Sequence, residues 1–374
     1  MEESNSLAIL LRCGAGAEPL RQLLEAHGSA HAARRAGPSA WRAQGFGAQS
    51  VARAAMPDAR ARALDDAWLA RPGHRLLGWL DPDYPELLRQ VPNPPAALWL
   101  RGDAALLWRP QVAIVGSRQP SAGGRDNAFA FARECSRAGL VVTSGLATGI
   151  DAAAHLGALD AGATIAVLGN GPDRCYPTSN ARLLEEIAER GCVVGELPPG
   201  AASSRGTFPS RNRIIAGLSL GTLVVEAAMR SGALITAGDA AKSGREVFAL
   251  PGSIHNSLSR GCHALIRSGA QLVETPEEVL ATLAHAAENA AALLRGEVQR
   301  PAALVAAASA REARPDGDDA AGRILRAMSH DPVNLDQLCQ RTGLTVAPLS
   351  AMLLALELEG KITAEHGRFT RRCC

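Results

Sequence analysis

Three arginines surround a single aromatic residue within one short stretch of this 374-residue chain. Arg205, Arg211 and Arg213 flank Phe208, and Asn212 adds an amide. Guanidinium groups beside an exposed ring are suited to holding a nucleic-acid backbone while a base stacks on the ring. The alternative interpretation is a solvated loop whose phenylalanine is folded back into the core. We therefore predict a candidate DNA clamp here and test it against the rest of the chain.

A second candidate site follows the apolar run Val112–Val115, which has the pattern of a buried strand. Gly116 allows close backbone approach, and Ser117, Ser121 and the start of the following helix supply donors suited to a phosphate. Arg118 adds a charge that can bind a phosphate in bidentate fashion. The alternative is a tight strand-to-helix turn with no ligand.

Two more predicted strand ends carry small residues, Ser144-Gly145 after one and Gly169 after the next. On the helix that follows the first of them, Asp151 and His155 are four residues apart. They are either an acid–base pair or a helix-start carboxylate with a histidine packed nearby, and we favour the second. Several possible phosphate-binding turns along one edge of the sheet suit the backbone of a polymer better than a single mononucleotide.

The predicted central domain alternates apolar runs with helical stretches, which indicates a parallel sheet covered on both faces. This is an α/β, Rossmann-like doubly wound fold, in which ligands bind at the carboxyl ends of the strands. Ile214 and Ile215 are expected to anchor the arginine-rich loop in its core. The predicted strands are Val112–Val115, Val141–Thr143, Thr164–Leu168, Cys192–Gly195, Leu223–Val225, Glu246–Ala249 and Gln271–Val273, and the predicted helices span 124–138, 149–160, 178–190, 209–219, 231–243, 258–268 and 276–288.

The flanking regions divide the chain further. Residues 1–75 predict small helices, either a helix-hairpin-helix or SAM-like unit or a plain packing domain. The central domain spans 76–288 and begins with a proline-rich segment that adds an edge strand, Leu98–Arg101. A linker, 289–319, leads to a winged-helix pattern in 320–374. Its third helix carries acidic and apolar groups without base-reading side chains, which favours protein binding over DNA reading.

Composition narrows the function classes. The net charge is +2, so nucleic-acid binding requires a local patch. Eight scattered cysteines without zinc-ligand spacing predict a reduced, cytoplasmic protein with no metal site. The acidic start does not resemble a signal peptide, and no run approaches the ~20 apolar residues of a membrane span. A P-loop, a dinucleotide-binding fingerprint and a catalytic constellation are absent from the sequence, so we expect no cofactor and no enzyme.

Six ordered motifs run through the central region. They are Val-Ala-Ile-Val-Gly-Ser-Arg from Val112, Ser-Gly-Leu-Ala from Ser144 through Ile-Asp151 to His155, Ala-Val-Leu-Gly from Ala166 through Tyr176-Pro177 to Asn180, Phe-Pro-Ser-Arg-Asn-Arg-Ile-Ile-Ala-Gly from Phe208, Val-Val-Glu-Ala from Val224 through Ser231 to Thr236, and the lead-in from Tyr84 to Gly102. Over about 80–285 these motifs resemble the DprA (Smf) family of DNA-processing proteins. The resemblance implies a dimeric protein that binds single-stranded DNA without strong sequence preference and loads RecA recombinase during natural transformation.

The same resemblance implies that two loops line the DNA pocket. They are Gly116-Ser117-Arg118 and the segment of Arg205, Phe208, Arg211, Asn212 and Arg213. Family members that carry a basic residue soon after the Tyr-Pro motif differ from this chain, which has Thr178 and Ser179 there.

Two other functions are compatible with parts of the sequence. Gly221-Thr222 followed by Glu226 resembles part of the motif of Rossmann-like nucleoside monophosphate phosphoribohydrolases, with Glu226 as the candidate acid, but their Pro-Gly-Gly lead is missing. The third hypothesis is a winged-helix transcription regulator with a ligand-sensing central domain.

Overall fold

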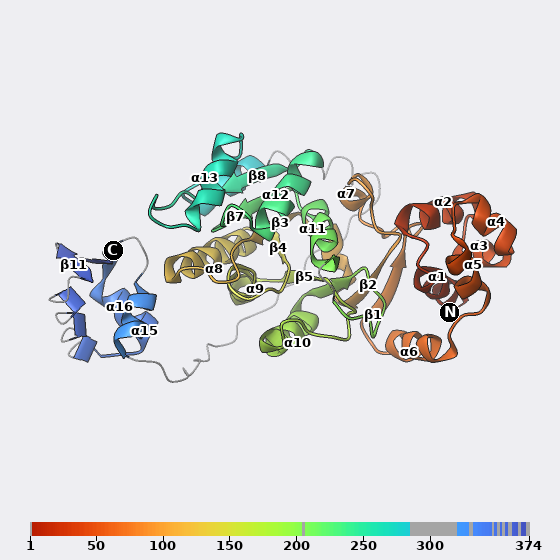
Figure 1. The fold of residues 1–374 in the computed structure, drawn as a ribbon, viewed down its shortest axis with the longest axis horizontal. Helices are drawn as coiled ribbons and strands as arrows, with labels where there is room; N and C mark the ends of the chain where they lie inside the picture. Colours follow the sequence, from red (N-terminus) through yellow and green to blue (C-terminus); the bar gives the residue numbers. More distant parts are fainter. Residues whose placement is uncertain are drawn as a thin grey trace.

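A computed structural model describes residues 2–203 and 206–284 and, with gaps, residues 320–371. Three parts follow one another in space as they do along the chain (Figure 1): a helical N-terminal region, a central sheet between helices, and a small C-terminal unit beside helix α8 (Ala122–Arg137). Arg205 and the predicted linker 289–319 lie outside the described residues. In the described part of the chain, every helix is too short or too polar to cross a membrane.

The central sheet has nine strands in the order β1-β2-β6-β5-β4-β3-β7-β8-β9. From β3 onward, neighbouring strands are parallel, and β2 pairs antiparallel with both β1 and β6. The seven predicted strands are all present, so the Rossmann-like fold is confirmed. The bounds are β1 (His74–Gly78), β2 (Ala97–Gly102), β3 (Gln111–Val115), β4 (Val141–Ser144), β5 (Thr164–Leu168), β6 (Cys192–Gly195), β7 (Gly221–Val224), β8 (Glu246–Ala249) and β9 (Gln271–Leu272).

The strand order of the sheet reverses between β3 and β7. Strands β4, β5 and β6 are added on one side of β3, and β7, β8 and β9 on the other. The helices that follow β3 and β7 therefore leave toward opposite faces, and a crevice opens outside the carboxyl ends of these two strands. The sheet order thus places any ligand site beyond Val115 and Val224.

The proline-rich segment supplies the predicted strand, Leu98–Arg101, as part of β2, but its predicted position at the edge of the sheet was wrong. Strand β1 pairs along the whole of β2, from His74 opposite Arg101 to Gly78 opposite Ala97. Strand β2 is consequently interior, and its Leu98, Trp99 and Leu100 side chains are fully buried. The sheet begins at His74, and Leu76 of β1 packs in the same hydrophobic cluster as the N-terminal helices.

Two helical layers cover the sheet (Figure 1). Alternate strand residues face opposite layers, as Val141 and Val142 do, because side chains of a strand alternate between its two faces. One layer holds α7 (Glu86–Arg89), α11 (Thr207–Leu218), α12 (Gly232–Lys242) and α13 (Ser259–Arg267), and the other holds α8, α9 (Ile150–Ala161), α10 (Ala181–Arg190) and the helical residues 276–284. Two short 3₁₀ turns span Ala104–Trp108 and Thr178–Asn180.

The N-terminal helices share one hydrophobic core with the outer strands. Trp68 packs edge-on against Trp99 of β2, with ring centroids 5.4 Å apart. Arg12 pairs with the buried Asp65 at 2.6 Å and also donates to the carbonyl of Pro199. This region is therefore fastened to the central sheet. Its helices are α1 (Glu2–Arg12), α2 (Ala17–His27), α3 (Ala30–Arg35), α4 (Gly37–Ala43), α5 (Ala48–Ala55) and α6 (Ala59–Leu69).

The C-terminal unit has the predicted winged-helix pattern of helices followed by a hairpin. Asn334 and Gln337 form a capping box that starts the second helix. Arg341 of that helix donates to Asp126 of α8, at 2.6 and 2.9 Å, and so contacts the central domain. Of the third predicted helix, residues 348, 349, 352, 353, 356 and 357 are described, and they are helical. The elements are α15 (Ala320–Ala327), β10 (Val333–Asn334), α16 (Leu335–Thr342), β11 (Ile362–Glu365) and β12 (Arg368–Arg371).

Candidate nucleic-acid interface

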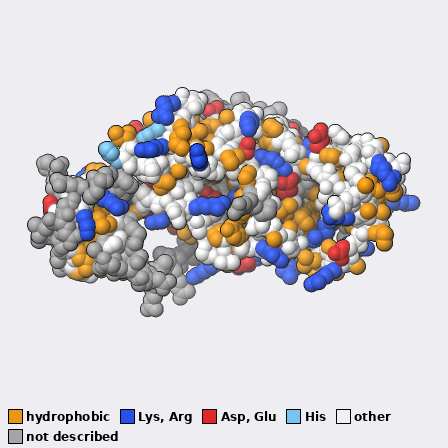
Figure 2. Space-filling model, viewed as in Figure 1, with side chains coloured by type: hydrophobic (Ala, Val, Ile, Leu, Met, Phe, Trp, Pro, Cys, Tyr) orange, Lys and Arg blue, Asp and Glu red, His pale blue; other side chains and the backbone are white. Residues whose placement is uncertain are grey.

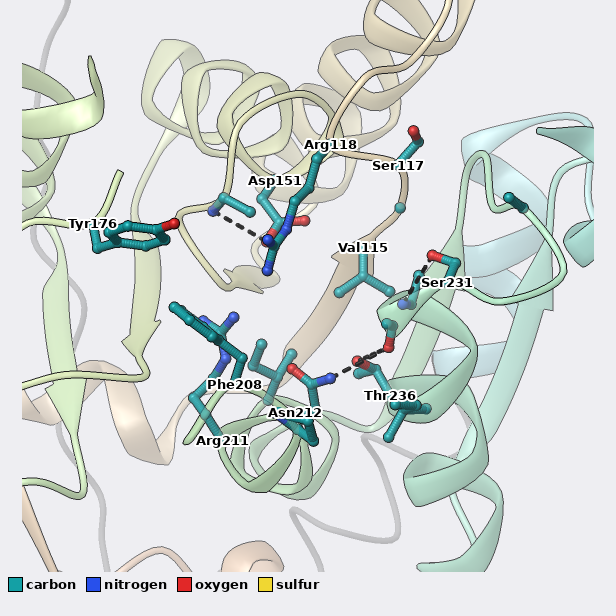
Figure 3. A pocket seen from close by; sticks show the side chains of 18 residues that line it. Val115, Ser117, Arg118, Asp151, Tyr176, Phe208, Arg211, Asn212, Ser231 and Thr236 are labelled. Carbon is teal, nitrogen blue, oxygen red and sulfur yellow. Dashed lines mark hydrogen bonds between the residues drawn. The ribbon is translucent and has the colours of Figure 1, made fainter. Parts of the chain in front are cut away.

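An open pocket of about 590 Å³ lies beyond the carboxyl ends of the central strands, where the sheet order predicts a site. Figure 3 shows side chains from several loops and two helix starts pointing into it. A smaller pocket of about 100 Å³ adjoins it and shares five of its residues, namely Arg118, Ala147, Tyr176, Phe208 and Arg211. The larger pocket is lined by Val115, Gly116, Ser117, Arg118, Ala147, Asp151, Tyr176, Phe208, Pro209, Arg211, Asn212, Ile215, Ala228, Ser231, Gly232, Ala233, Ile235 and Thr236.

The loop after β3 brings Gly116, Ser117 and Arg118 to the pocket, as predicted. Gly116 is required by close packing, because a Cβ there would lie 2.6 Å from Ile150 Cγ1 and 2.9 Å from the Glu226 carbonyl oxygen. The Ser117 amide donates to that same carbonyl at 2.7 Å. Arg118 is exposed, and its guanidinium carbon lies 5.4 Å from the centre of the Phe208 ring. Its charge is therefore available to a ligand.

The phosphate seat predicted at Ser121 and the start of α8 is already filled by a carboxylate. Glu226 accepts hydrogen bonds from the Ser121 amide at 2.8 Å and from the Ser121 hydroxyl at 2.7 Å. Asn256 donates a third bond to Glu226 at 3.0 Å. Because a carboxylate and a phosphate satisfy the same donors, this helix start cannot also hold the ligand.

Helix α11 begins at Thr207, two residues before the predicted helix 209–219, so Phe208 and the arginines after it lie on its first turns. Phe208, Arg211, Asn212 and Ile215 have helical spacing and line the pocket from one face of the helix. Residue 213 lies off that face, and the structure does not bring Arg213 to the pocket. Arg213 instead pairs with Glu196 at 2.6 Å, away from the ligand side.

Arg211 lies beneath the pocket and is buried. Its Nη1 donates to the carbonyl of Gly145 at 2.7 Å and also to the carbonyl of Val167. Burial lowers the pKa of Arg211 to about 10, against the opposing effect of the nearby Asp151 carboxylate. Arg211 stays protonated at neutral pH, joins the loop after β4 to strand β5 and contributes positive charge to the pocket floor.

Asp151 and His155 follow the interpretation that we favoured. Asp151 accepts hydrogen bonds from the amides of Gly145 and Ala147 at the start of α9, at 3.2 and 3.3 Å. Burial raises the pKa of Asp151, while Arg211 acts in the opposite direction. His155 is fully buried, lies outside the pocket, and contacts the Thr164 hydroxyl through Nδ1 at 2.8 Å.

Burial lowers the pKa of His155 to about 3, well below the value of ~6.5 in an unfolded chain. Acid therefore favours the unfolded state, and the stability contributed by neutral His155 is lost as pH falls below about 6.5. Between pH 7 and pH 5 we expect a loss of about 2 kcal/mol from this group alone. Unfolding by urea at the two pH values, compared with His155→Gln, would measure it. An unchanged pH dependence in the variant would contradict this prediction.

The remaining predicted residues have structural contacts. The Ser144 hydroxyl is buried and donates to the carbonyl of Ile114 at 2.7 Å, so it joins β4 to β3. Gly145 supplies the carbonyl that Arg211 binds and lines the smaller pocket. Gly169 lies against Phe208, because a Cβ at Gly169 would be 3.0 Å from the ring. Gly169 therefore lets the phenylalanine approach the end of β5.

Sequence reasoning left Tyr176, Ile235 and Thr236 out of the predicted site, although all three line the pocket. The Tyr176-Pro177 motif was a usable signal, because an aromatic residue after a parallel strand lies at the ligand end of the sheet. Ser231 caps α12, because its hydroxyl accepts a hydrogen bond from the Ala233 amide at 3.2 Å. Among the described residues, no group of three histidine, cysteine or acidic side chains could hold a metal ion.

Comparison with known proteins assigns this fold, including the region of the pocket, to a family. The family model for DNA recombination-mediator protein A matches residues 75–284, and that for the DprA winged helix domain matches 307–368. Protein Smf of Escherichia coli is 40% identical over 314 residues, covering 82% of this chain and 80% of the relative. The DNA processing protein DprA of Streptococcus pneumoniae is 45% identical over 221 residues, covering 58% of this chain and 78% of the relative.

Two solved structures share the architecture. The X-ray structure of DprA from Streptococcus pneumoniae matches with a TM-score of 0.66 and 36% identity, over 75% of this chain and 98% of that chain. A structure of DNA processing protein A from Helicobacter pylori, described for its single-stranded DNA binding mode, matches with a TM-score of 0.52 and 30% identity, over 57% of this chain and 96% of that chain. From its strand order, its pocket and these matches, the chain belongs to the DNA recombination-mediator protein A (DprA/Smf) family.

Proposed function

We propose that this protein binds single-stranded DNA in the pocket beyond β3 and β7 and loads RecA recombinase onto the bound strand. The observation that carries the proposal is the pairing of exposed Arg118 with the Phe208 ring at the pocket wall. A guanidinium that can reach a phosphate next to an aromatic ring that can support a base fits an unpaired strand. The Helicobacter pylori relative, described as binding single-stranded DNA, supports the same ligand.

The proposed DNA contacts differ in kind. Gly116 and Ser117 offer backbone and hydroxyl groups, Arg118 offers charge, and Phe208 offers a ring. Asn212 is buried and donates to the carbonyl of Gly232 at 3.3 Å, so we assign it to positioning α12. Ser144, Gly145 and Gly169 shape the pocket through the contacts described above. A DNA contact by Arg205 stays a prediction, because this residue lies outside the described part of the chain. We assign Arg211 and Arg213 to holding the fold, because their guanidinium groups bind other residues of the protein.

RecA loading, a homodimer and a role in natural transformation complete the proposal and rest on family membership. The scattered free thiols favour a cytoplasmic location. We retain the division into 1–75, 76–288, 289–319 and 320–374 as part of the proposal, with the winged helix assigned to protein binding.

The test compares single-stranded and duplex DNA of equal length on one preparation of the full chain, followed by RecA filament assembly on strands coated with a single-strand-binding protein. We expect tighter binding to the single strand and faster filament assembly in the presence of this protein. Equal affinity for both DNA forms would contradict the proposed ligand. Selective single-strand binding without faster assembly would contradict only the RecA step.

The alternative function, hydrolysis of nucleoside monophosphates, requires an acid that reaches the ligand. Glu226 does not line the pocket, and Ser121 and Asn256 occupy its carboxylate oxygens. We therefore expect no release of free base when the protein is incubated with nucleoside monophosphates and the products are separated by chromatography. Base release that disappears in Glu226→Gln would contradict this expectation.

A further inference from the structure

Two aromatic rings of the pocket differ in how accessible they are. Tyr176 is 50% exposed, whereas Phe208 is only partly exposed. The Phe208 ring lies against Gly169, carries the Arg118 guanidinium over it, and has the Tyr176 ring 5.4 Å away at a tilt of 40°. A base arriving in the pocket therefore meets the tyrosine ring before it can displace Arg118 from the phenylalanine.

Tyr176 also lies where the two pockets meet, since it lines both of them. Figure 3 shows its hydroxyl directed into the larger pocket, facing the side from which Arg118 enters. Within the described part of the chain, this hydroxyl has no hydrogen-bond partner. Among those residues, no polar contact to the tyrosine hydroxyl would have to be broken by a ligand.

The loop that carries Tyr176 is nevertheless held in place by hydrogen bonds from two asparagine side chains to backbone carbonyls. Asn170 is buried, and its side chain donates to the carbonyls of Gly171 and Arg174 at 2.9 and 2.8 Å. At the other end of the loop, Asn180 donates to the carbonyl of Leu146 at 2.9 Å. A ring presented on a preorganised loop loses little conformational entropy when a ligand binds.

We propose that Tyr176 is the primary base-stacking surface of this pocket and that Phe208 supports it. This inference rests on the proposed single-stranded DNA binding and names the residue that makes it selective for unpaired bases. The faces of a base inside a duplex are covered by its neighbours, whereas an unpaired base can turn one face onto the tyrosine. Arg118, next to the rings, is placed to hold the adjoining phosphate.

The experiment measures the coupling between the tyrosine ring and the bases. The full chain is titrated with a fluorescent oligo-dT strand and with an abasic strand of the same length and label. Tyr176→Ala is expected to weaken binding to oligo-dT by roughly 5- to 150-fold, the range for loss of one stacked base. Its affinity for the abasic strand should stay within about twofold of wild type, because only phosphate contacts are left there.

Three further variants make the result specific. Tyr176→Phe restores the ring and should recover most of the lost affinity for oligo-dT. Phe208→Ala should produce a smaller base-dependent loss than Tyr176→Ala. Phe129→Ala is the matched control: this ring on α8 also lies beneath an arginine, Arg133 at 5.9 Å, but it is absent from both pockets. Thermal unfolding of each variant shows whether the fold is kept.

The outcomes separate the inference from the function on which it rests. Equal loss of affinity for both strands in Tyr176→Ala would overturn the stacking role, as would no loss at all. A larger base-dependent loss in Phe208→Ala would make the phenylalanine the primary surface and overturn the assignment. A wild-type protein that binds both strands equally would exclude base stacking and leave backbone binding intact. A wild-type protein that binds neither strand would overturn the proposed function together with this inference.

Discussion

Arg118→Ala is expected to weaken binding of single-stranded DNA by about 1.5–3 kcal/mol, roughly a 10- to 150-fold rise in Kd. The reason is that Arg118 is an exposed arginine on the pocket wall, where its guanidinium can leave the Phe208 ring for a phosphate. Fluorescence anisotropy with a labelled oligonucleotide, repeated over a range of salt concentrations, measures both the affinity and its salt dependence. The slope of log K against log salt should fall by about 0.7 if one phosphate contact is lost.

The control for this prediction removes an arginine elsewhere. Arg137 is exposed at the end of α8, where it pairs with Glu134 at 2.9 Å. Arg137→Ala lowers the net charge by the same amount but lies outside the pocket, so the affinity should change little. If both variants weakened binding equally, DNA binding would follow total charge, and the pocket would lose its role. An unchanged affinity in Arg118→Ala would remove this residue from the interface.

Replacing Arg211 should damage the fold before it damages the interface. Arg211→Met removes the hydrogen bonds to the carbonyls of Gly145 and Val167 and leaves the buried Asp151 without its compensating cation. Breaking such a buried arrangement typically costs about 3–5 kcal/mol. For a domain of this size we expect a fall in Tm of the order of 10 °C, measured by thermal unfolding with circular dichroism.

A double variant distinguishes a structural role of Arg211 from a direct DNA contact. Asp151→Asn removes the charge that Arg211→Met would strand, so the double variant should regain part of the lost Tm. The exposed Arg118→Ala, in contrast, should leave Tm nearly unchanged. If Arg211→Met kept its Tm and lost DNA affinity as Arg118→Ala does, Arg211 would be a phosphate ligand, and the structural assignment would fail.

The sequence was sufficient for the architecture because parallel strands buried on both faces are continuous apolar runs. All seven predicted strands exist, and the segments that follow β3, β4, β5, β6 and β7 line one pocket. Strand β1 was missed because only two of its residues, Leu76 and Leu77, are apolar, and its partner, β2, was taken for the edge. Such a strand is identified by what it pairs with, and pairing is a property of the folded chain.

The location of the candidate site could be predicted from the sequence, but the contacts that its residues make could be predicted only in part. Ordered motifs put Arg118 and Phe208 at the ligand end of the sheet, since a residue after a parallel strand lies there in any doubly wound fold. The same reasoning could not show that Glu226 fills the start of α8, because that carboxylate comes from a segment 105 residues away in sequence. It also passed over Tyr176, whose exposure depends on how its loop is braced.

The sequence by itself determined the family, the doubly wound sheet and the rim where a ligand binds, because hydrophobic runs and glycine-rich strand ends are local patterns. The tertiary structure alone decided the role of each arginine. Once α11 begins at Thr207, helical geometry sends Arg211 beneath the pocket to buried carbonyls and Arg213 to Glu196. Arg118 lies on a different loop and is exposed at the pocket wall, where its guanidinium can reach a ligand.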